Sequence, residues 1–96
     1  MRNCQFTIVM TNNHWGDYDI IRAAARTLNG VAFKLFFYLS AFKDNSTIEF
    51  SPSDFCKYAQ VSLTSEKNAF KELVLNKYLV EIEPLFYQFY PMAGLK

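Results

Sequence analysis

The sequence predicts a single-domain α+β fold, in which a small helical core is followed by a C-terminal β-hairpin. Residues 30–42 are the most apolar stretch, and their hydrophobic side chains recur at helical spacing. Two further helix signals meet at a three-residue turn, residues 60–62. After Lys77 the hydrophobic period changes from that of a helix to that of a strand. The 96 residues, 1–96, are enough for one domain with a single hydrophobic core.

The N-terminal part, residues 1–27, is expected to supply a strand and a short helix. Residues 5–10 (QFTIVM) are apolar and β-branched, and the polar tripeptide TNN ends them, which is typical of a strand. A loop at residues 12–17 and a helix at residues 18–25 follow. His14 has no second histidine or cysteine near it in this loop, so no metal site is expected there.

The apolar stretch at residues 30–42 is expected to be a core helix that other elements surround. Asn29 precedes it and is a suitable N-cap, because its side-chain oxygen can accept a backbone N–H of the first turn. The stretch is too short and too interrupted by polar residues to span a membrane. A polar turn at residues 43–47 and a short alternating strand at residues 47–50 are expected to follow.

The clearest local signal is the sequence SPSD, in which Ser51 is placed to cap a helix and Pro52 fits its first position. This signal predicts a helix over residues 52–59. After the three-residue turn, Ser62 is placed to cap a second helix, which is predicted to run from residue 63 to about residue 76.

Residues 78–90 are expected to form a two-stranded antiparallel hairpin, with strands at 78–82 and 85–90. The aromatic residues of the second strand alternate between its two sides. Since a small hairpin cannot easily bury both sides, one side is a candidate protein-binding surface; the alternative is that the N-terminal strand or the tail covers it. Residues 91–96 are expected to be a loose tail. The candidate protein-interface residues are Leu85, Phe86, Tyr87, Phe89 and Tyr90.

Composition and charge exclude several classes of function. The formal net charge is +1, which gives no overall attraction to nucleic acid. One His, three Gly and two widely separated Cys supply no nucleophile–base pair, metal cluster or glycine-rich phosphate loop. Neither an enzymatic activity nor a metal or other cofactor is therefore expected. Without a recognisable signal peptide or membrane span, a cytoplasmic location is expected.

The order of the predicted elements is that of a winged helix-turn-helix domain, because two short helices joined by a tight turn are followed directly by a hairpin. Three stretches carry this order: LNGVAFKLFFYLSAF, FSPSDFCKYAQVS and AFKELVLNKYLV. They resemble the winged helix-turn-helix modules of phage and plasmid replication-initiation and replisome-organiser proteins. In that family the pattern runs roughly LSxxAFKLYxYL, FSPxDFAxxxGIS and RAFKELxxKGYLV. The resemblance covers residues 28–82.

The resemblance implies that the helix beginning at residue 63 recognises double-stranded DNA, and that the protein acts in replication or transcription control in a bacterial host cell. Its lysines would contact phosphates, and Asn68 would contact an adenine edge. The alternative is that this is an ordinary solvated helix face. The candidate DNA-binding residues are Ser62, Thr64, Ser65, Lys67, Asn68 and Lys71.

Several positions depart from the family pattern. Asn68 replaces an arginine, Glu66 an apolar or aromatic residue, and Lys77 a glycine. The hairpin carries Glu81 and Glu83, where DNA-binding wings usually present Lys or Arg. A lone monomer is therefore expected to bind DNA weakly, and a homodimer is the expected DNA-binding form. The alternative function is a phage-encoded inhibitor that binds another protein, for example a host defence nuclease such as CRISPR-Cas.

Overall fold

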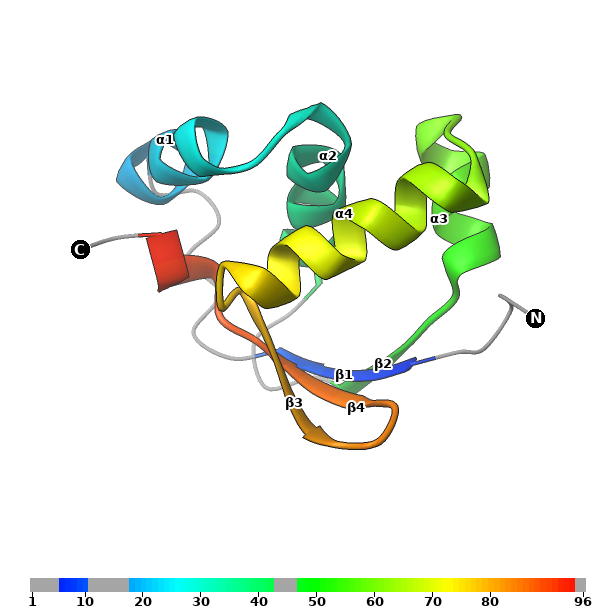
Figure 1. Ribbon diagram of the computed structural model, residues 1–96. Coiled ribbons are helices and arrows are strands. Elements are labelled where there is room, and N and C mark those ends of the chain that lie inside the picture. The colour runs from blue at the N-terminus through cyan, green and yellow to red at the C-terminus, as the bar shows by residue number, and fades with distance from the viewer. Residues whose placement is uncertain (1–5, 11–17, 43–46, 95–96) are drawn as a thin grey trace.

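The computed structural model describes residues 6–10, 18–42 and 47–94. This part of the chain has an α+β fold, in which four α-helices lie on one side of a four-stranded mixed sheet (Figure 1). The expected α+β class is confirmed. The expected winged-helix arrangement, a three-helix core with a two-stranded hairpin, differs from the structure in two ways. The helix expected at residues 18–25 packs in the same layer as the other three, and the strands expected at residues 5–10 and 47–50 join the hairpin in one sheet. The expected loop at 12–17 and turn at 43–46 lie outside the described residues.

Local capping signals fix where the central helices begin. The side chains of Asn29, Ser51 and Ser62 accept a backbone N–H three residues further on, at 3.0, 3.3 and 3.1 Å. These bonds satisfy donors that the first turn of a helix leaves without a partner. All three caps confirm the expectations from the sequence. The helices are α1 (Tyr18–Thr27), α2 (Gly30–Ser40), α3 (Pro52–Ala59), α4 (Leu63–Leu75) and a short 3-10 helix, η1 (Pro91–Gly94).

Several predicted element bounds were wrong, including those of the hairpin strands, which run over residues 79–83 and 86–89 rather than 78–82 and 85–90. α1 continues two residues past the expected end at residue 25, and α2 ends two residues before residue 42. Residues 91–94 form η1 rather than a loose tail. Pro91 is buried and η1 contacts α1, so tertiary packing orders this segment although its sequence has no strong local signal.

The N-terminal strand lies inside the sheet rather than at its margin. The strand order is β2 (Thr47–Phe50), β1 (Phe6–Met10), β4 (Phe86–Phe89) and β3 (Leu79–Glu83). β1 is antiparallel to β2 and parallel to β4, while β3 and β4 form the expected antiparallel hairpin. β1 therefore connects the hairpin to the strand that precedes α3.

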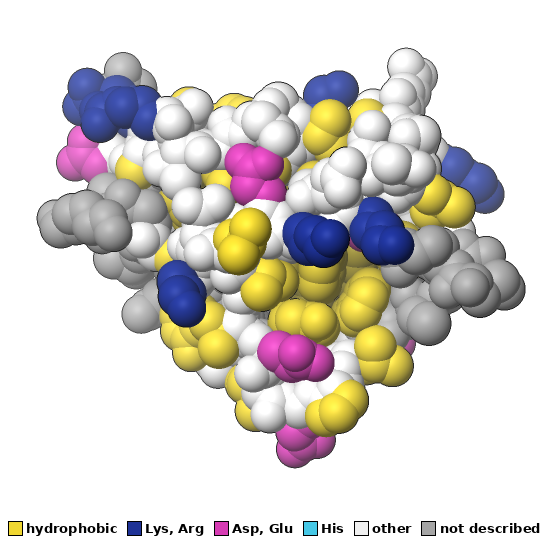
Figure 2. Space-filling view, in the orientation of Figure 1, with side chains coloured by type: hydrophobic (Ala, Val, Ile, Leu, Met, Phe, Trp, Pro, Cys, Tyr) yellow, Lys and Arg dark blue, Asp and Glu magenta, His cyan; other side chains and the backbone are white. Residues whose placement is uncertain are grey.

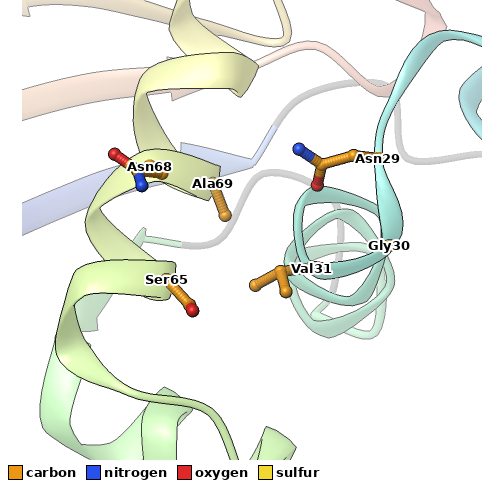
Figure 3. Close-up of a pocket in the computed structure, with 6 residues that line it drawn as sticks. All are labelled: Asn29, Gly30, Val31, Ser65, Asn68 and Ala69. Carbon is orange, nitrogen blue, oxygen red and sulfur yellow. The ribbon is translucent and has the colours of Figure 1, made fainter.

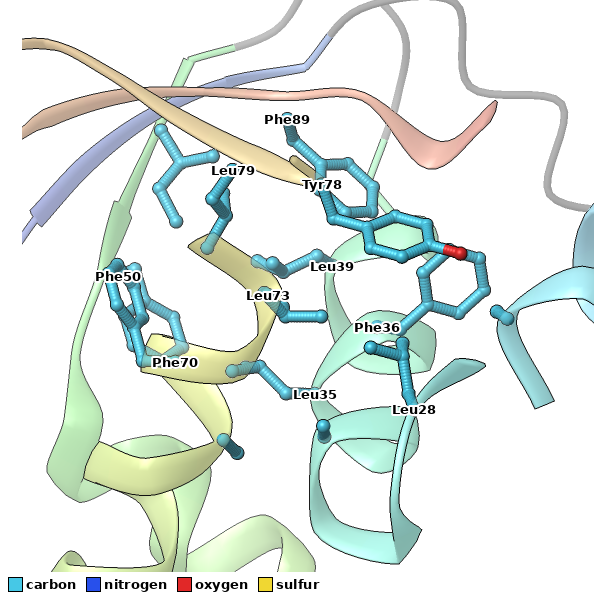
Figure 4. Packing of buried hydrophobic residues seen from close by; sticks show 14 of the residues in the cluster. Leu28, Leu35, Phe36, Leu39, Phe50, Phe70, Leu73, Tyr78, Leu79 and Phe89 are labelled. Carbon is cyan, nitrogen blue, oxygen red and sulfur yellow. The ribbon is translucent and has the colours of Figure 1, made fainter. Parts of the chain in front are cut away.

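The core lies between the helical layer and the sheet, and α2 is at its centre (Figure 4). Leu35, Phe36 and Leu39 of α2 are completely buried, which confirms the expected core helix. The ring of Phe36 lies 5.5 Å from that of Tyr78, which directly precedes β3, and 6.0 Å from that of Phe89, at the end of β4. The two layers are thereby held together by aromatic packing.

Candidate nucleic-acid interface

α4 turns one polar face away from the rest of the molecule. Its other side packs on the core through Ala69, Phe70 and Leu73, all of which are buried. Residues spaced by three, four and seven lie on one side of a helix, so a single exposed face carries four of the predicted DNA-binding residues. These exposed residues are Thr64, Lys67, Asn68 and Lys71.

The side chains of Ser62 and Ser65 are hydrogen-bonded to each other at the N-terminus of α4. The Ser62 hydroxyl donates to the Ser65 hydroxyl at 3.1 Å, in addition to its capping bond. Ser62 is exposed, whereas Ser65 is half-buried. Ser65 points into the space between α4 and α2, as Figure 3 shows. The sequence-based grouping of Ser65 with the outward face was therefore wrong, because its position on the helix turns it toward α2.

A cleft of about 290 Å³ separates α4 from the N-terminal end of α2 (Figure 3). A Cβ atom added at Gly30 would meet nothing within 4 Å, so this position has room for a side chain. Its lining supplies amide and hydroxyl groups and no charged side chain. Sequence reasoning did not bring these residues together, because they come from two helices that are far apart in the chain. The lining residues are Asn29, Gly30, Val31, Ser65, Asn68 and Ala69.

Glu72 holds the N-terminus of α2 against α4. Its carboxylate accepts the backbone N–H of Asn29 at 2.8 Å and the side-chain N–H of Asn29 at 2.5 Å. At the same time, the side-chain oxygen of Asn29 accepts the N–H of Ala32. The negative charge also lies at the positive end of the α2 dipole. The sequence analysis missed this link, which fixes the position of α4 relative to the core helix.

Glu66 points away from the exposed face of α4. Its side chain is completely buried, within the first turn of the helix. The helix dipole favours a negative charge at this end. The departure from the family pattern at this position therefore adds no negative charge to the surface around Lys67 and Lys71.

α4 ends in a motif that usually contains glycine. Lys77 has φ = 69°, and its N–H donates to the carbonyl of Val74 at 3.1 Å. The N–H of Tyr78 donates to the carbonyl of Leu73 at 2.9 Å. This is the hydrogen-bond pattern of a Schellman motif, with Lys77 in the left-handed conformation. The chain is thereby turned directly into β3.

Two of the five candidate protein-interface residues belong to the inner side of the sheet. Phe89 is completely buried, so its assignment to an exposed surface was wrong: it faces α2 and completes the core. Tyr87 is half-buried, and its ring lies 5.6 Å from Phe6 and 5.1 Å from Phe70. β1 and α4 thus cover part of the aromatic side of the hairpin. This agrees with the alternative given in the sequence analysis, in which the N-terminal strand covers that side.

The remaining candidates, Leu85, Phe86 and Tyr90, stay at least partly accessible. Leu85 is 48% exposed and Tyr90 38%, whereas Phe86 is half-buried. The Tyr90 hydroxyl donates to the Gln88 side chain at 3.1 Å. Leu85 has φ = 62° in the hairpin turn, and its carbonyl accepts the N–H of Thr7 at 2.9 Å. The turn is therefore attached to β1.

Acidic side chains lie over the hairpin, on the same face of the molecule as the basic side chains of α4 (Figure 2). The acidic residues of β3 are Glu81 and Glu83, and both are exposed. Burial raises the pKa of Tyr87 above its ordinary value of 10.0, and the nearby charge of Glu81 raises it further. Glu81 therefore borders the aromatic surface that Tyr87 forms with α4.

Comparison of the chain with protein-family models, curated proteins and solved structures found no match. Across residues 6–10, 18–42 and 47–94, no group of three or more His, Cys, Asp or Glu side chains is placed to hold a metal ion. None of the helices in this part of the chain is long and apolar enough to cross a membrane.

Proposed function

We propose that this chain is a small winged helix DNA-binding protein of phage or mobile-element type, with α4 as its recognition helix and a role in replication or transcription control. The observation that carries the proposal is the outward face of α4, where Lys67, Asn68 and Lys71 are exposed while the opposite side is fixed in the core. The order of α2, β2, α3, α4, β3 and β4 is also that of a winged helix-turn-helix domain.

The dimensions and chemistry of α4 suit a major groove. Thirteen helical residues are about 20 Å long, and the major groove, about 12 Å wide, admits an α-helix. Lys67 and Lys71 lie one turn apart and would each neutralise a phosphate. Asn68 lies next to them on the side of α4 that borders the cleft, and it would pair with the edge of an adenine, which presents one donor and one acceptor.

The hairpin makes DNA binding weak and sensitive to salt. Two lysines on α4 supply few phosphate contacts, and each contact adds about one unit to the slope of log affinity against log salt concentration. Glu81 and Glu83 repel a phosphate backbone that approaches from the hairpin side. Binding is therefore expected at low ionic strength only.

The proposal is tested by titrating a labelled DNA duplex at low salt and measuring fluorescence anisotropy. The wild type is expected to bind, and Lys67→Glu with Lys71→Glu is expected to abolish binding. The matched control is Arg22→Glu with Arg26→Glu, which makes the same charge change at exposed positions of α1. The proposal is contradicted if the wild type binds no duplex, or if both double variants lose binding equally.

A second candidate function, a phage-encoded inhibitor of a host protein such as a CRISPR-Cas nuclease, is favoured by the surface of the hairpin. Ile82 is 52% exposed and stands between Glu81 and Glu83, and Leu85 protrudes from the turn. This function would be supported if the protein captured one host protein from extract in a 1:1 ratio, and if the variant Ile82→Ser with Leu85→Ser no longer captured it. Recovery of nucleic acid without such a protein would count against it.

A further inference from the structure

One face of the molecule carries a basic, an apolar and an acidic band (Figure 2). The basic band consists of Lys67 and Lys71 on α4, and the acidic band of Glu81 and Glu83 on β3. Between them, hydrophobic side chains gather in the space that separates α4 from the hairpin, as Figure 2 shows. All four charged residues are exposed, so they are available to a partner.

The apolar band is built from aromatic residues of three elements. Phe70 of α4 stacks on Phe6 of β1, with ring centres 4.6 Å apart, and meets the edge of Tyr87 of β4 at 5.1 Å. Val74 is half-buried and follows Phe70 by one turn on the same side of α4. Phe70 itself is buried beneath the band, whereas Phe6 and Tyr87 remain partly accessible. A partly exposed aromatic surface of this kind is typical of protein interfaces.

The two charged bands border this apolar band on opposite sides. On α4, Lys67 precedes Phe70 by three residues and Lys71 precedes Val74 by three residues, so each lysine lies about one turn from a residue of the apolar band. On the hairpin, Glu81 lies opposite Tyr87 in the register of β3 and β4. The order across the face is therefore basic, apolar and acidic.

We propose that this face binds a second copy of the same chain, about a two-fold axis that runs along the apolar band. Rotation by 180° about that axis exchanges the two sides of the face. Lys67 and Lys71 of each copy then lie opposite Glu81 and Glu83 of the other, and the two apolar bands meet. A two-fold interface must be complementary to itself, and this pattern meets that condition without any contribution from another protein.

Self-association in this form would cover the outward face of α4. DNA and the second copy would compete for the same lysines. The dimer would therefore be unable to bind DNA through α4, and DNA binding would require its dissociation into monomers. The self-association rests on the pattern of charge and apolar surface alone. Only the competition with DNA rests on the proposed function.

Sedimentation velocity of the purified full chain over a concentration series at low salt tests the dimer. The wild type is expected to dimerise. Lys67→Glu with Lys71→Glu, and separately Glu81→Lys with Glu83→Lys, are each expected to weaken dimerisation by at least about tenfold, because like charges then face each other. The control variant Arg22→Glu with Arg26→Glu is expected to dimerise as the wild type does.

Mixing the two weakened variants gives the most specific result. One has acidic residues on both sides of the apolar band and the other has basic residues on both sides, so the mixture is expected to form a heterodimer that neither forms alone. If a double variant does not fold, as judged by circular dichroism, Lys71→Glu and Glu83→Lys take the place of the two pairs. A wild type that stays monomeric, or a mixture that associates no better than its components, overturns the proposal.

A DNA titration of the Glu81→Lys, Glu83→Lys variant separates this proposal from the proposed function. This variant is expected to bind DNA more tightly than the wild type, because it has lost both the dimer and the repulsion of phosphate. If none of the proteins binds DNA, the proposed function fails, while the sedimentation results still decide the dimer.

Discussion

Lys77 occupies, with φ = 69°, a position where glycine is usual after a helix. A left-handed conformation costs a residue with a Cβ atom about 1 kcal/mol. We expect Lys77→Gly to raise the free energy of unfolding by about that amount, measured by urea denaturation. Lys57→Gly, at an exposed position within α3, is the matched control and should lower it by about 1 kcal/mol. Equal destabilisation by the two changes would contradict the assigned conformation of Lys77.

Tyr78 makes stability depend on pH in the alkaline range. Burial raises the pKa of Tyr78 above its ordinary value of 10.0, and the neighbouring Thr27 hydroxyl offsets part of that rise. Because the folded state keeps the phenolic proton to higher pH than the unfolded state does, this stabilisation is complete below pH 10.0 and is lost as the pH rises through the folded pKa. Burial also raises the pKa of Tyr38 and Tyr87, so they contribute to the same loss.

The variant Tyr78→Phe tests this pH dependence. We expect the urea midpoint of the wild type to fall as the pH rises above 10.0, and that of Tyr78→Phe to fall less, because phenylalanine has no phenolic proton to lose. Tyr90→Phe, at an exposed residue, should keep the wild-type dependence. A fall of equal size in all three proteins would show that the buried hydroxyl of Tyr78 is not its cause.

At the scale of elements, α2 and α4 are joined by Asn29, which caps one helix and donates to Glu72 of the other. Removal of an N-cap costs about 1 kcal/mol, and loss of a hydrogen bond to a carboxylate adds a similar amount. We expect Asn29→Ala to lower the free energy of unfolding by about 2 kcal/mol. Ser51→Ala, which removes only the cap of α3, should cost about 1 kcal/mol. Equal costs in urea denaturation would mean that the bond to Glu72 contributes no stability.

The elements themselves were largely predictable, and their long-range contacts were not. The bounds of β2 and α3 and the caps Ser51 and Ser62 were predicted correctly, because side chains within a few residues determine them. The strand signal of β1 was equally local. Its place between β2 and β4 was not predicted, since that depends on pairings with segments about 40 and 80 residues away.

At the scale of the whole molecule, the same limit applies to the candidate interface. The outward face of α4 follows from helical spacing alone, so Lys67, Asn68 and Lys71 were placed correctly on the surface. Phe89 was misassigned because the alternation of a strand does not reveal which of its sides meets the core. The hydrogen bond between Asn29 and Glu72 joins residues 43 positions apart, so no local sequence pattern predicts it.

The central claim is that the outward face of α4 contacts DNA, and NMR titration of the labelled protein with a short duplex at low salt tests it most directly. We expect the largest amide shift changes at residues 62–71, and small changes on α1, which lies at the far end of the helical layer (Figure 1). The shifts should reverse when salt is added. Shift changes centred on α1 or on the outer side of the sheet, or a spectrum that the duplex leaves unchanged, would contradict the claim.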